Sequence, residues 1–515
     1  MKADLVVLQG SVITMDPSYP KVEGIAVKGE KILALGKNEE ISNLIGPETK
    51  VLNAYGNTVL PGFIDCHVHF MQTGIDMQKV DLTNCKSLLQ LKTIIDEQTD
   101  KASPGQWIMG TGYDEFSFAE KRLPTREELD ESSPNKPVWL SRVDHHSCVV
   151  NSSAEKILNI PRDIEGIEKD PATGNTTGNL KGDANSYARQ KINKLFDKKT
   201  RYNAAKKAAE LMLSKGITTI HALEGGSLFY DDDVDILLDL KEELPIHVSL
   251  FYQTTDVKKV LDRGLKRIGG CLLIDGSLGS RTAALMESYT DAPGGKGILY
   301  FDDKELEEFV TEAHRKGLQI TFHAIGDRGI EQVLKTYEKV LKKYPRPDHR
   351  HRIEHFCLTA PSQIERCVKA GIILSVQPAW VNYESTLGGM WASRLGNDRA
   401  KRISPLSSMV LSGAVICGGS DSPITPAGPL SGIHGGVNHF QKDESLSRKI
   451  MTSFFTTNAA YAGFEEKIKG RLAPGYLADI VILGADLFSV PDSGIADIPV
   501  ATTIVQGGIK FSLNN

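Results

Sequence analysis

The sequence predicts an α/β protein, a (β/α)₈ TIM barrel with a small β-sandwich domain formed by both chain ends and an insertion after the first barrel strand. Three observations support this fold class. Apolar strands alternate with helical stretches through the middle of the 515-residue chain, β-rich segments of similar texture stand at both ends, and a long polar stretch separates the first two barrel strands. A chain of this length can bury a large core.

Eight short apolar stretches are predicted as barrel strands, because strands that alternate with helices form a parallel sheet and eight of them close it. In chain order they are residues 62–70, 216–224, 245–251, 271–277, 318–327, 351–356, 372–380 and 414–421. A helical pattern over residues 201–216 places Gly216 as a C-terminal cap. We assign residues 61–464 to the barrel.

Residues 1–60 and 465–515 consist of short β-rich runs broken by glycine and polar turns, without a long helical period. Their common texture predicts that they fold together as one β-sandwich domain. Residues 71–215 are rich in Ser, Pro, Asn and Asp, with Trp107 and Trp139 among them. This stretch is too long for a plain connection, so we predict an inserted lid or subdomain over the barrel mouth.

The net charge of -5 and the pI near 6.3 give no basic excess, which argues against nucleic acid or an anionic membrane as a partner. No window offers the roughly 20 apolar residues of a membrane-spanning helix, and the interrupted apolar stretch at the N-terminus is predicted as a strand, not a signal peptide. Seven scattered cysteines without a Cys-x-x-Cys pair fit free thiols. These features predict a cytoplasmic protein.

Two histidines stand two residues apart in the first strand, GFIDCHVHF. Alternate side chains of a strand share a face, so Asp65, His67 and His69 point the same way. Two imidazoles on one rigid strand form half of a coordination shell for zinc, iron, nickel or copper. The alternative is a pair of hydrogen-bonded histidines that line a polar crevice.

Polar residues at three other strand ends decide between these alternatives. His323 ends the fifth strand, His355 the sixth and Asp421 the eighth. The carboxyl ends of all strands meet at one face of a parallel barrel, where the active sites of this fold lie. Core packing gives no reason to gather these groups there, so their convergence predicts a metal centre.

In these residues the chain resembles the metal-dependent amidohydrolase superfamily, and within it amidohydrolase family 3, which includes N-substituted formamide deformylases. The matching stretches are LPGFIDCHVHF, RVDHHSCVVNSSA, GITTIHALEGG, IDGSLGSRTAAL, TFHAIGDRGI, HRIEHF, SVQPAW, GGSDSPI and GRLAPGYLADIVIL, in this order from about residue 58 to 483. The resemblance implies one or two divalent metal ions, with zinc as the first expectation, and often a homodimer. The implied metal ligands are His67, His69, His323, His355 and Asp421.

The resemblance also implies hydrolysis of a C–N bond in an amide, an N-acyl amine or an N-formyl amine. Asp421 would be the general base that takes a proton from the attacking water and passes it to the leaving nitrogen. Taken alone, an aspartate before Pro423 is equally typical of a turn. The alternatives are a deaminase or lyase on the same metal site, because fold does not fix function, and a metal-free degenerate scaffold.

One position departs from the family pattern. Where relatives commonly carry a lysine that becomes carboxylated and bridges two metals, this chain has Cys271. Alternation in a strand would place Cys271, Leu273 and Asp275 on one face, so the thiol could look into the barrel. Either it ligates the metal as a thiolate, or it is a small core residue beside a single ion.

Substrate contacts are expected from two regions. Arg142 and His146 match a family segment that approaches the site from the insertion, and we predict that they bind the substrate. Trp380, Tyr383 and Trp391 follow the seventh strand, and Trp380 is predicted to wall an apolar pocket, with loop packing as the alternative.

Arg352 and Glu354 share a face of the sixth strand. Their opposite charges favour a buried ion pair that braces this strand over a part in catalysis.

Overall fold

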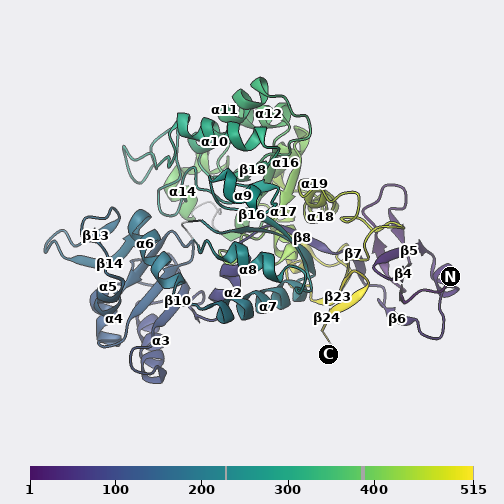
Figure 1. Cartoon of the computed structure of the whole chain (residues 1–515), viewed down its shortest axis with the longest axis horizontal. Helices are drawn as coiled ribbons and strands as arrows, with labels where there is room; N and C mark the ends of the chain where they lie inside the picture. Colours follow the sequence, from purple (N-terminus) through teal and green to yellow (C-terminus); the bar gives the residue numbers. More distant parts are fainter. Residues whose placement is uncertain (227–228, 384–388, 514–515) are drawn as a thin grey trace. The chain divides into compact units, whose positions relative to one another are not determined.

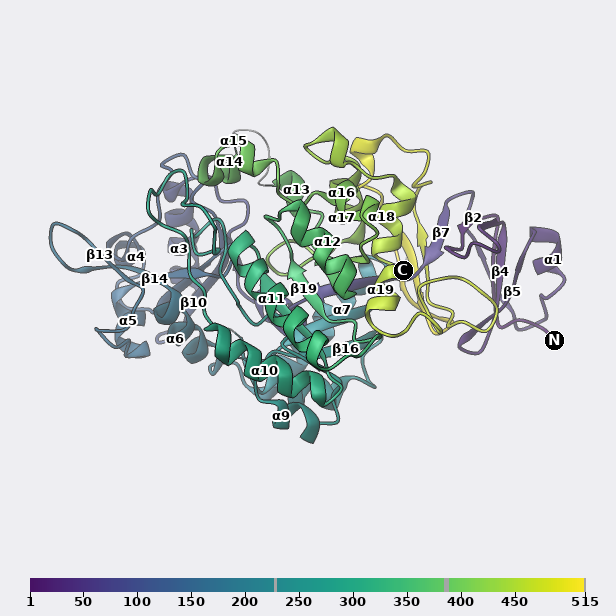
Figure 2. The same ribbon diagram turned by 90° about the horizontal axis from the view of Figure 1, so that it is seen from above.

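The computed structural model describes residues 1–226, 229–383 and 389–513 (Figure 1, Figure 2). The chain forms two compact units, each described here by itself. The first unit comprises Met1–His69, Ala208–Leu223 and Asp239–Asn515, and the second comprises Phe70–Lys207 and Glu224–Leu238.

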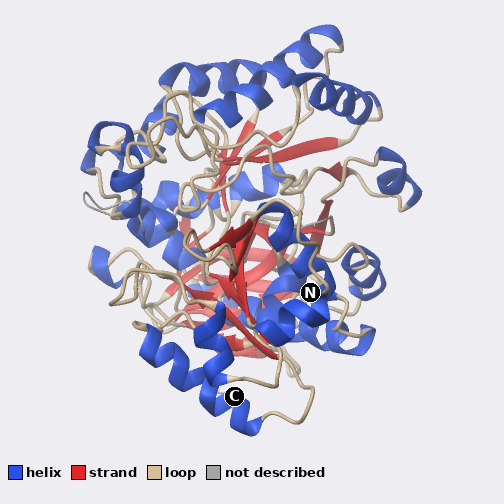
Figure 3. Cartoon of the chain, turned by 90° about the vertical axis from the view of Figure 1, so that its left-hand side faces the viewer, coloured by secondary structure: helices blue, strands red, loops and turns tan. Residues whose placement is uncertain are grey.

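The first unit contains the predicted barrel, a sheet of eight strands that run parallel. Strands are red and helices are blue in Figure 3. In chain order these are β8 (Phe63–Val68), β15 (Ile217–Glu224), β16 (His247–Tyr252), β17 (Arg267–Ile268), β18 (Gln319–Ala324), β19 (Arg352–His355), β20 (Ile373–Val376) and β21 (Ile416–Gly418). The barrel closes where Val68 bridges Ser422 just past β21, and the His69 N–H donates to the Ser422 carbonyl at 2.9 Å. The fold class predicted from the sequence is therefore confirmed.

The fourth strand lies before its predicted place. β17 comprises Arg267–Ile268, whereas the sequence predicted residues 271–277, and that prediction was wrong. Gly269, with a φ of 96°, turns the chain out of the ladder, because only glycine adopts this conformation readily. The chain still runs beside β18 after this turn, through a bridge between Leu273 and His323.

Helices follow the barrel strands in the chain. The first unit includes α9 (Val257–Asp262), α10 (Asp303–Arg315), α11 (Asp327–Lys343), α12 (Pro361–Ala370), α13 (Trp380–Tyr383), α14 (Met390–Leu395), α15 (Asn397–Ala400), α16 (Leu406–Leu411), α17 (Pro429–Val437), α18 (Arg448–Phe454) and α19 (Thr457–Ala462). α10 begins where the Asp302 side chain accepts the Glu305 N–H at 2.7 Å, and it buries one apolar face. Within the described residues, no helix is both long and apolar enough to cross a membrane.

Gly216 ends the helix that precedes β15, as predicted. The helix α7 (Lys198–Ser214) stops just before Gly216, whose φ is 77°. A Cβ at this position would lie 2.7 Å from Cγ2 of Val481. Both the conformation and the close packing therefore require glycine.

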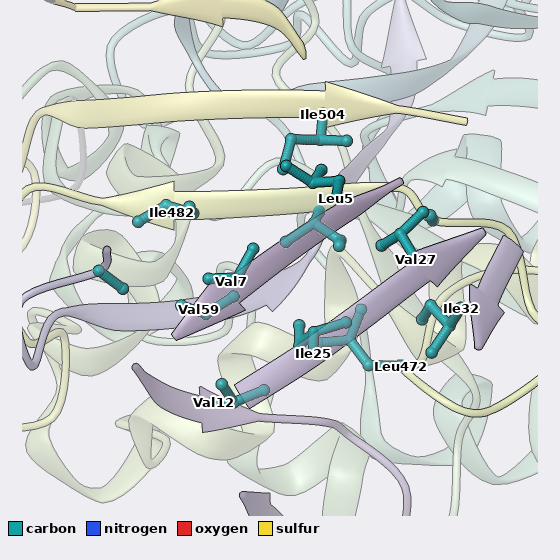
Figure 4. Packing of buried hydrophobic residues seen from close by; sticks show 13 residues of the cluster. Leu5, Val7, Val12, Ile25, Val27, Ile32, Val59, Leu472, Ile482 and Ile504 are labelled. Atoms are coloured by element: carbon teal, nitrogen blue, oxygen red, sulfur yellow. The ribbon is translucent and has the colours of Figure 1, made fainter. Parts of the chain in front are cut away.

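Two packed β-sheets combine both ends of the chain. One contains β5 (Lys31–Gly36), β4 (Gly24–Lys28), β1 (Leu5–Leu8) and β6 (Lys50–Asn53). The other contains β24 (Gly508–Ser512), β23 (Val500–Val505), β22 (Ile480–Leu483), β7 (Thr58–Pro61), β2 (Ser11–Ile13) and β3 (Lys21–Val22). Leu5 and Val27 of the first sheet share one buried core with Val59 and Ile504 of the second (Figure 4). Each fully buried aliphatic side chain stabilises the fold by roughly 1.5–3 kcal/mol.

The second unit is built on a sheet of its own. Its strands, in spatial order, are β13 (Ile167–Lys169), β14 (Thr176–Lys181), β12 (Ser147–Val150), β11 (Val138–Arg142), β10 (Ile108–Tyr113) and β9 (Val80–Asp81). Its helices include α2 (Phe70–Asp76), α3 (Leu88–Lys101), α4 (Arg126–Ser132), α5 (Ser152–Leu158), α6 (Gly182–Asn193) and the start of α7. The stretch predicted as an insertion supplies most of this unit, and its position over the barrel mouth stays a prediction.

Candidate metal centre

The five residues predicted as metal ligands lie at the carboxyl ends of barrel strands. His67 is on β8 and His69 follows directly after it. His323 stands near the end of β18, and His355 is the last residue of β19. Asp421 follows β21, and all five side chains are buried. The fold thus places these groups at the end of the barrel where the sequence predicted a site.

Asp421 brings the two histidines of the first strand together. Its Oδ1 lies 3.1 Å from Nε2 of His67 and 3.2 Å from Nε2 of His69. Within the part of the chain that the structure describes, Oδ1 of Asp421 and Nε2 of His67 are buried without a hydrogen bond. Buried polar atoms in that state are costly, so a cation bound between them would satisfy both.

The thiol of Cys271 faces the other two histidines. Its Sγ lies 3.6 Å from Nδ1 of His323 and 3.7 Å from Nε2 of His355. Two sets of three residues have donor atoms within 4.8 Å of one another, namely His67, Cys271 and His355, and His67, His69 and Asp421. The two sets share His67, which therefore stands between two candidate metal positions.

Each of the four imidazoles is anchored through one nitrogen while the other nitrogen points at Asp421 or Cys271. The anchoring pairs are His67 Nδ1 with Glu354 Oε2 at 2.7 Å, His69 Nδ1 with the Leu223 carbonyl at 3.0 Å, His355 Nδ1 with Gln377 Oε1 at 2.7 Å, and His323 Nε2 with the Gly276 carbonyl at 3.2 Å. Since every anchor is an acceptor, the anchored nitrogen carries a proton, and the other nitrogen can offer its lone pair to a metal once its own proton has left. Metal-binding histidines are held in this way.

The donor set fits a divalent metal such as zinc, which accepts nitrogen, thiolate and carboxylate ligands. Burial alone would lower the pKa of His67, but the negative charge of Asp421 raises it well above its usual range. Burial alone would raise the pKa of the Cys271 thiol, but hydrogen bonds with His323 and His355 hold it well below its usual range. The site therefore favours the thiolate, which is the form that binds metal.

Trp380, predicted to wall an apolar pocket, lies beside this centre. Its ring stacks on His355 with 5.1 Å between ring centroids and 13° between planes. It also packs against a buried apolar cluster that includes Tyr289 and Trp391. The side chain of Tyr383 lies outside the described residues. An apolar wall thus borders the metal residues on the side of His355.

Arg142 and His146, predicted to bind the substrate, belong to the second unit. The Arg142 guanidinium makes ion pairs with Glu115 at 2.8 Å, Asp144 at 2.9 Å and Asp114 at 3.3 Å. The backbone N–H of His146 donates to Asp144 at 3.1 Å. These contacts brace the end of β11 and the turn after it, and the role of both residues toward a substrate stays a prediction.

The sequence did not reveal that two side chains, Glu354 and Gln377, anchor candidate metal ligands. Arg352 and Glu354 form the predicted buried ion pair, 2.8 Å from Nε to Oε1, but Glu354 also anchors His67. The sequence predicted no role for Gln377, which anchors His355. Its only sequence signal is its position directly after the seventh strand, in SVQPAW.

Comparisons with known proteins agree with this architecture. A model described as the amidohydrolase family matches residues 50–511. Protein LONG AFTER FAR-RED 3 of Arabidopsis thaliana is 31% identical, over 98% of this chain and 91% of its own length. N-substituted formamide deformylase of Arthrobacter pascens is 25% identical, over 99% of this chain and 98% of its own length. The crystal structure of an uncharacterized metal-dependent hydrolase from Pyrococcus horikoshii OT3 superimposes with a TM-score of 0.77 at 26% identity, covering 95% of this chain and 99% of that one.

Proposed function

This chain belongs to the amidohydrolase family, and on that premise we propose that it hydrolyses a C–N bond of a small molecule with a divalent metal held by His67, His69, Cys271, His323, His355 and Asp421. The observation that carries the proposal is the common orientation of the four anchored imidazoles toward Asp421 and Cys271. The fold alone would not support the proposed function, because the same barrel architecture hosts many reactions.

Asp421 is the proposed general base. When bound by these residues, a divalent metal would lower the pKa of a water molecule to about 7 and polarise a carbonyl group. A carboxylate beside that water can take its proton and deliver it to the leaving nitrogen. Burial alone would raise the pKa of Asp421, but the charge of His67 holds it well below its usual range. Asp421 is therefore ionised, which is the form that can coordinate a metal or take up a proton.

Cys271 is proposed as a ligand in place of the lysine of related enzymes. Its Sγ contacts His323 and His355 and shares a set of close donors with His67. A small core residue would have no reason to point its sulfur at two imidazoles. Thiolate is a favourable zinc ligand, which supports zinc as the metal.

An N-acyl or N-formyl amine with an apolar substituent is the proposed substrate. The relative from Arthrobacter pascens is named for the removal of formyl groups from N-substituted formamides. The aromatic wall formed by Trp380 would bury an apolar group of the substrate beside His355. Deamination and elimination on the same metal site are the alternative reactions.

The test is a product-resolved screen with zinc-loaded protein. N-formyl amines, N-acyl amines and cyclic amides are supplied separately, and the released acid, amine or ammonia is identified by mass spectrometry. We expect release of a carboxylic acid and an amine that depends on added zinc. Ammonia as the main product would indicate a deaminase, and no turnover of any amide would contradict the proposal.

A further inference from the structure

Arg352 crosses the interior of the barrel and joins four of its strands. Its guanidinium donates to Glu354 on its own strand β19, to the Cys66 carbonyl on β8 at 2.7 Å, and to the Ser375 hydroxyl on β20 at 3.0 Å. Its remaining Nη contacts Nδ1 of His221 on β15 at 2.9 Å. These side chains are fully buried. Barrel interiors are usually filled by branched aliphatic side chains, so a charged group that spans one requires an explanation.

The carboxylate of Glu354 is held at both oxygens. Oε1 accepts from Nε of Arg352 at 2.8 Å and from the hydroxyl of Thr321. Oε2 accepts from Nη2 of Arg352 at 2.9 Å and from Nδ1 of His67 at 2.7 Å. Four donors leave this carboxylate little freedom to move, and the imidazole of His67 is fixed with it.

We propose that Arg352 and Glu354 are positioning residues of the metal centre, which hold His67 so that its Nε2 faces the ligands that it shares. The inference rests on the proposed metal site. Glu354 fixes the tautomer of His67 and makes its Nε2 a stronger electron-pair donor toward a metal, as carboxylates do for metal-binding histidines. Arg352 holds Glu354 and also the backbone just before His67, through the Cys66 carbonyl. Because His67 belongs to both candidate ligand sets, loosening it weakens metal binding at both positions.

The competing explanation is that the ion pair only braces the barrel. A buried pair is destabilising to break, since the remaining charge loses its partner. Glu354→Gln alone would leave the buried charge of Arg352 without its partner and could unfold the protein. The double variant Arg352→Met/Glu354→Gln removes both charges and keeps similar volume, so it tests the anchor of His67 without an unpaired buried charge.

The matched control is the buried ion pair of Arg201 and Asp233, which lies in the second unit. Nη1 of Arg201 lies 2.7 Å and 2.8 Å from the two oxygens of Asp233, and both side chains are buried. None of the candidate metal ligands contacts either residue through a described interaction. Arg201→Met/Asp233→Asn therefore removes a comparable pair without touching His67.

Zinc affinity of the metal-free, folded proteins is measured by competition with a chromophoric chelator, and the absorption spectrum of bound Co²⁺ reports ligand geometry. We expect the Arg352/Glu354 double variant to bind zinc about 10- to 100-fold more weakly, with an altered Co²⁺ spectrum, and the control to match the wild type. Wild-type affinity and spectrum in the folded double variant would overturn the inference, as would an equal loss in the control. If the wild type binds no zinc or Co²⁺, the proposed metal site itself fails.

Discussion

Nε2 of His67 lies 3.1 Å from Oδ1 of Asp421, and the backbone N–H of Asp421 donates to the His67 carbonyl at 2.7 Å. His67 lies on the first strand of the barrel, and Asp421 follows the last strand. The contacts that close the barrel therefore also assemble the candidate site. Metal binding should depend on barrel closure, and variants at the two residues should separate metal loss from loss of chemistry.

Replacing both histidines of the first strand should empty the site. His67→Ala together with His69→Ala removes two nitrogen donors that solvent replaces poorly, so bound metal and turnover should both be lost. Elemental analysis of the purified protein measures the metal. The control is His439→Ala, a buried histidine whose described contacts are with the Ser404 and Gln441 backbone and with the Phe440 ring. Full metal content in the double variant would refute the ligand assignment.

Asp421→Asn should separate binding from catalysis. An amide can still coordinate weakly but cannot accept the proton, so at least one metal should remain while kcat falls by about 10²- to 10⁴-fold. Metal content and the pH–rate profile are measured on the same preparation. Survival of the wild-type rate and pH profile would place the general base elsewhere.

Cys271→Ala should remove one of two metals and most of the activity if the thiolate is a ligand. If Cys271 were only a core residue, the small cavity would cost on the order of 1 kcal/mol and leave the metal count unchanged. Cys367→Ala is the control, because Cys367 is equally buried but lies on α12. Metal stoichiometry and thermal stability of both variants distinguish the two outcomes.

Stability should fall in acid partly because of His349. Burial lowers the pKa of this histidine to about 4, from an ordinary value near 6.5. Between these two pKa values the unfolded chain binds a proton that the native protein does not. The contribution of His349 to the free energy of unfolding is therefore fully present above pH 6.5 and is lost as the pH falls toward 4. This loss in the free energy of unfolding amounts to about 3 kcal/mol. Urea unfolding between pH 4 and 8 should show a weaker pH dependence in His349→Gln, and identical slopes would contradict the assignment.

The barrel could be predicted from the sequence because each strand carries its own apolar signal between helical patterns. The fourth strand was predicted too late in the chain, since Gly269 ends it after Ile268 and the apolar run that follows contacts β18 only through the isolated bridge at Leu273. A local pattern does not show where a ladder hydrogen bond will be made. That choice is set by the neighbouring strand.

The candidate site could be predicted only in part. Histidines at strand ends are visible in the sequence, but their anchors are not, because the bond between His67 and Glu354 spans 287 positions. Arg142 illustrates the same limit, since its acidic partners Asp114 and Glu115 come from the segment after the neighbouring strand β10. Side-chain partners across a fold follow from tertiary packing, which one sequence does not reveal.

The sheet shared by both chain ends sets an order for folding during synthesis. β7 pairs with β22, and the hydroxyl of Thr58 donates to Asp486 across 428 positions. On the ribosome, the apolar face of β7 must wait for almost the whole chain to emerge before this partner exists. All barrel strands are translated before β22, so this sheet is completed after them. Until then the edge of β7 that pairs with β22 is open, and an open strand edge favours aggregation.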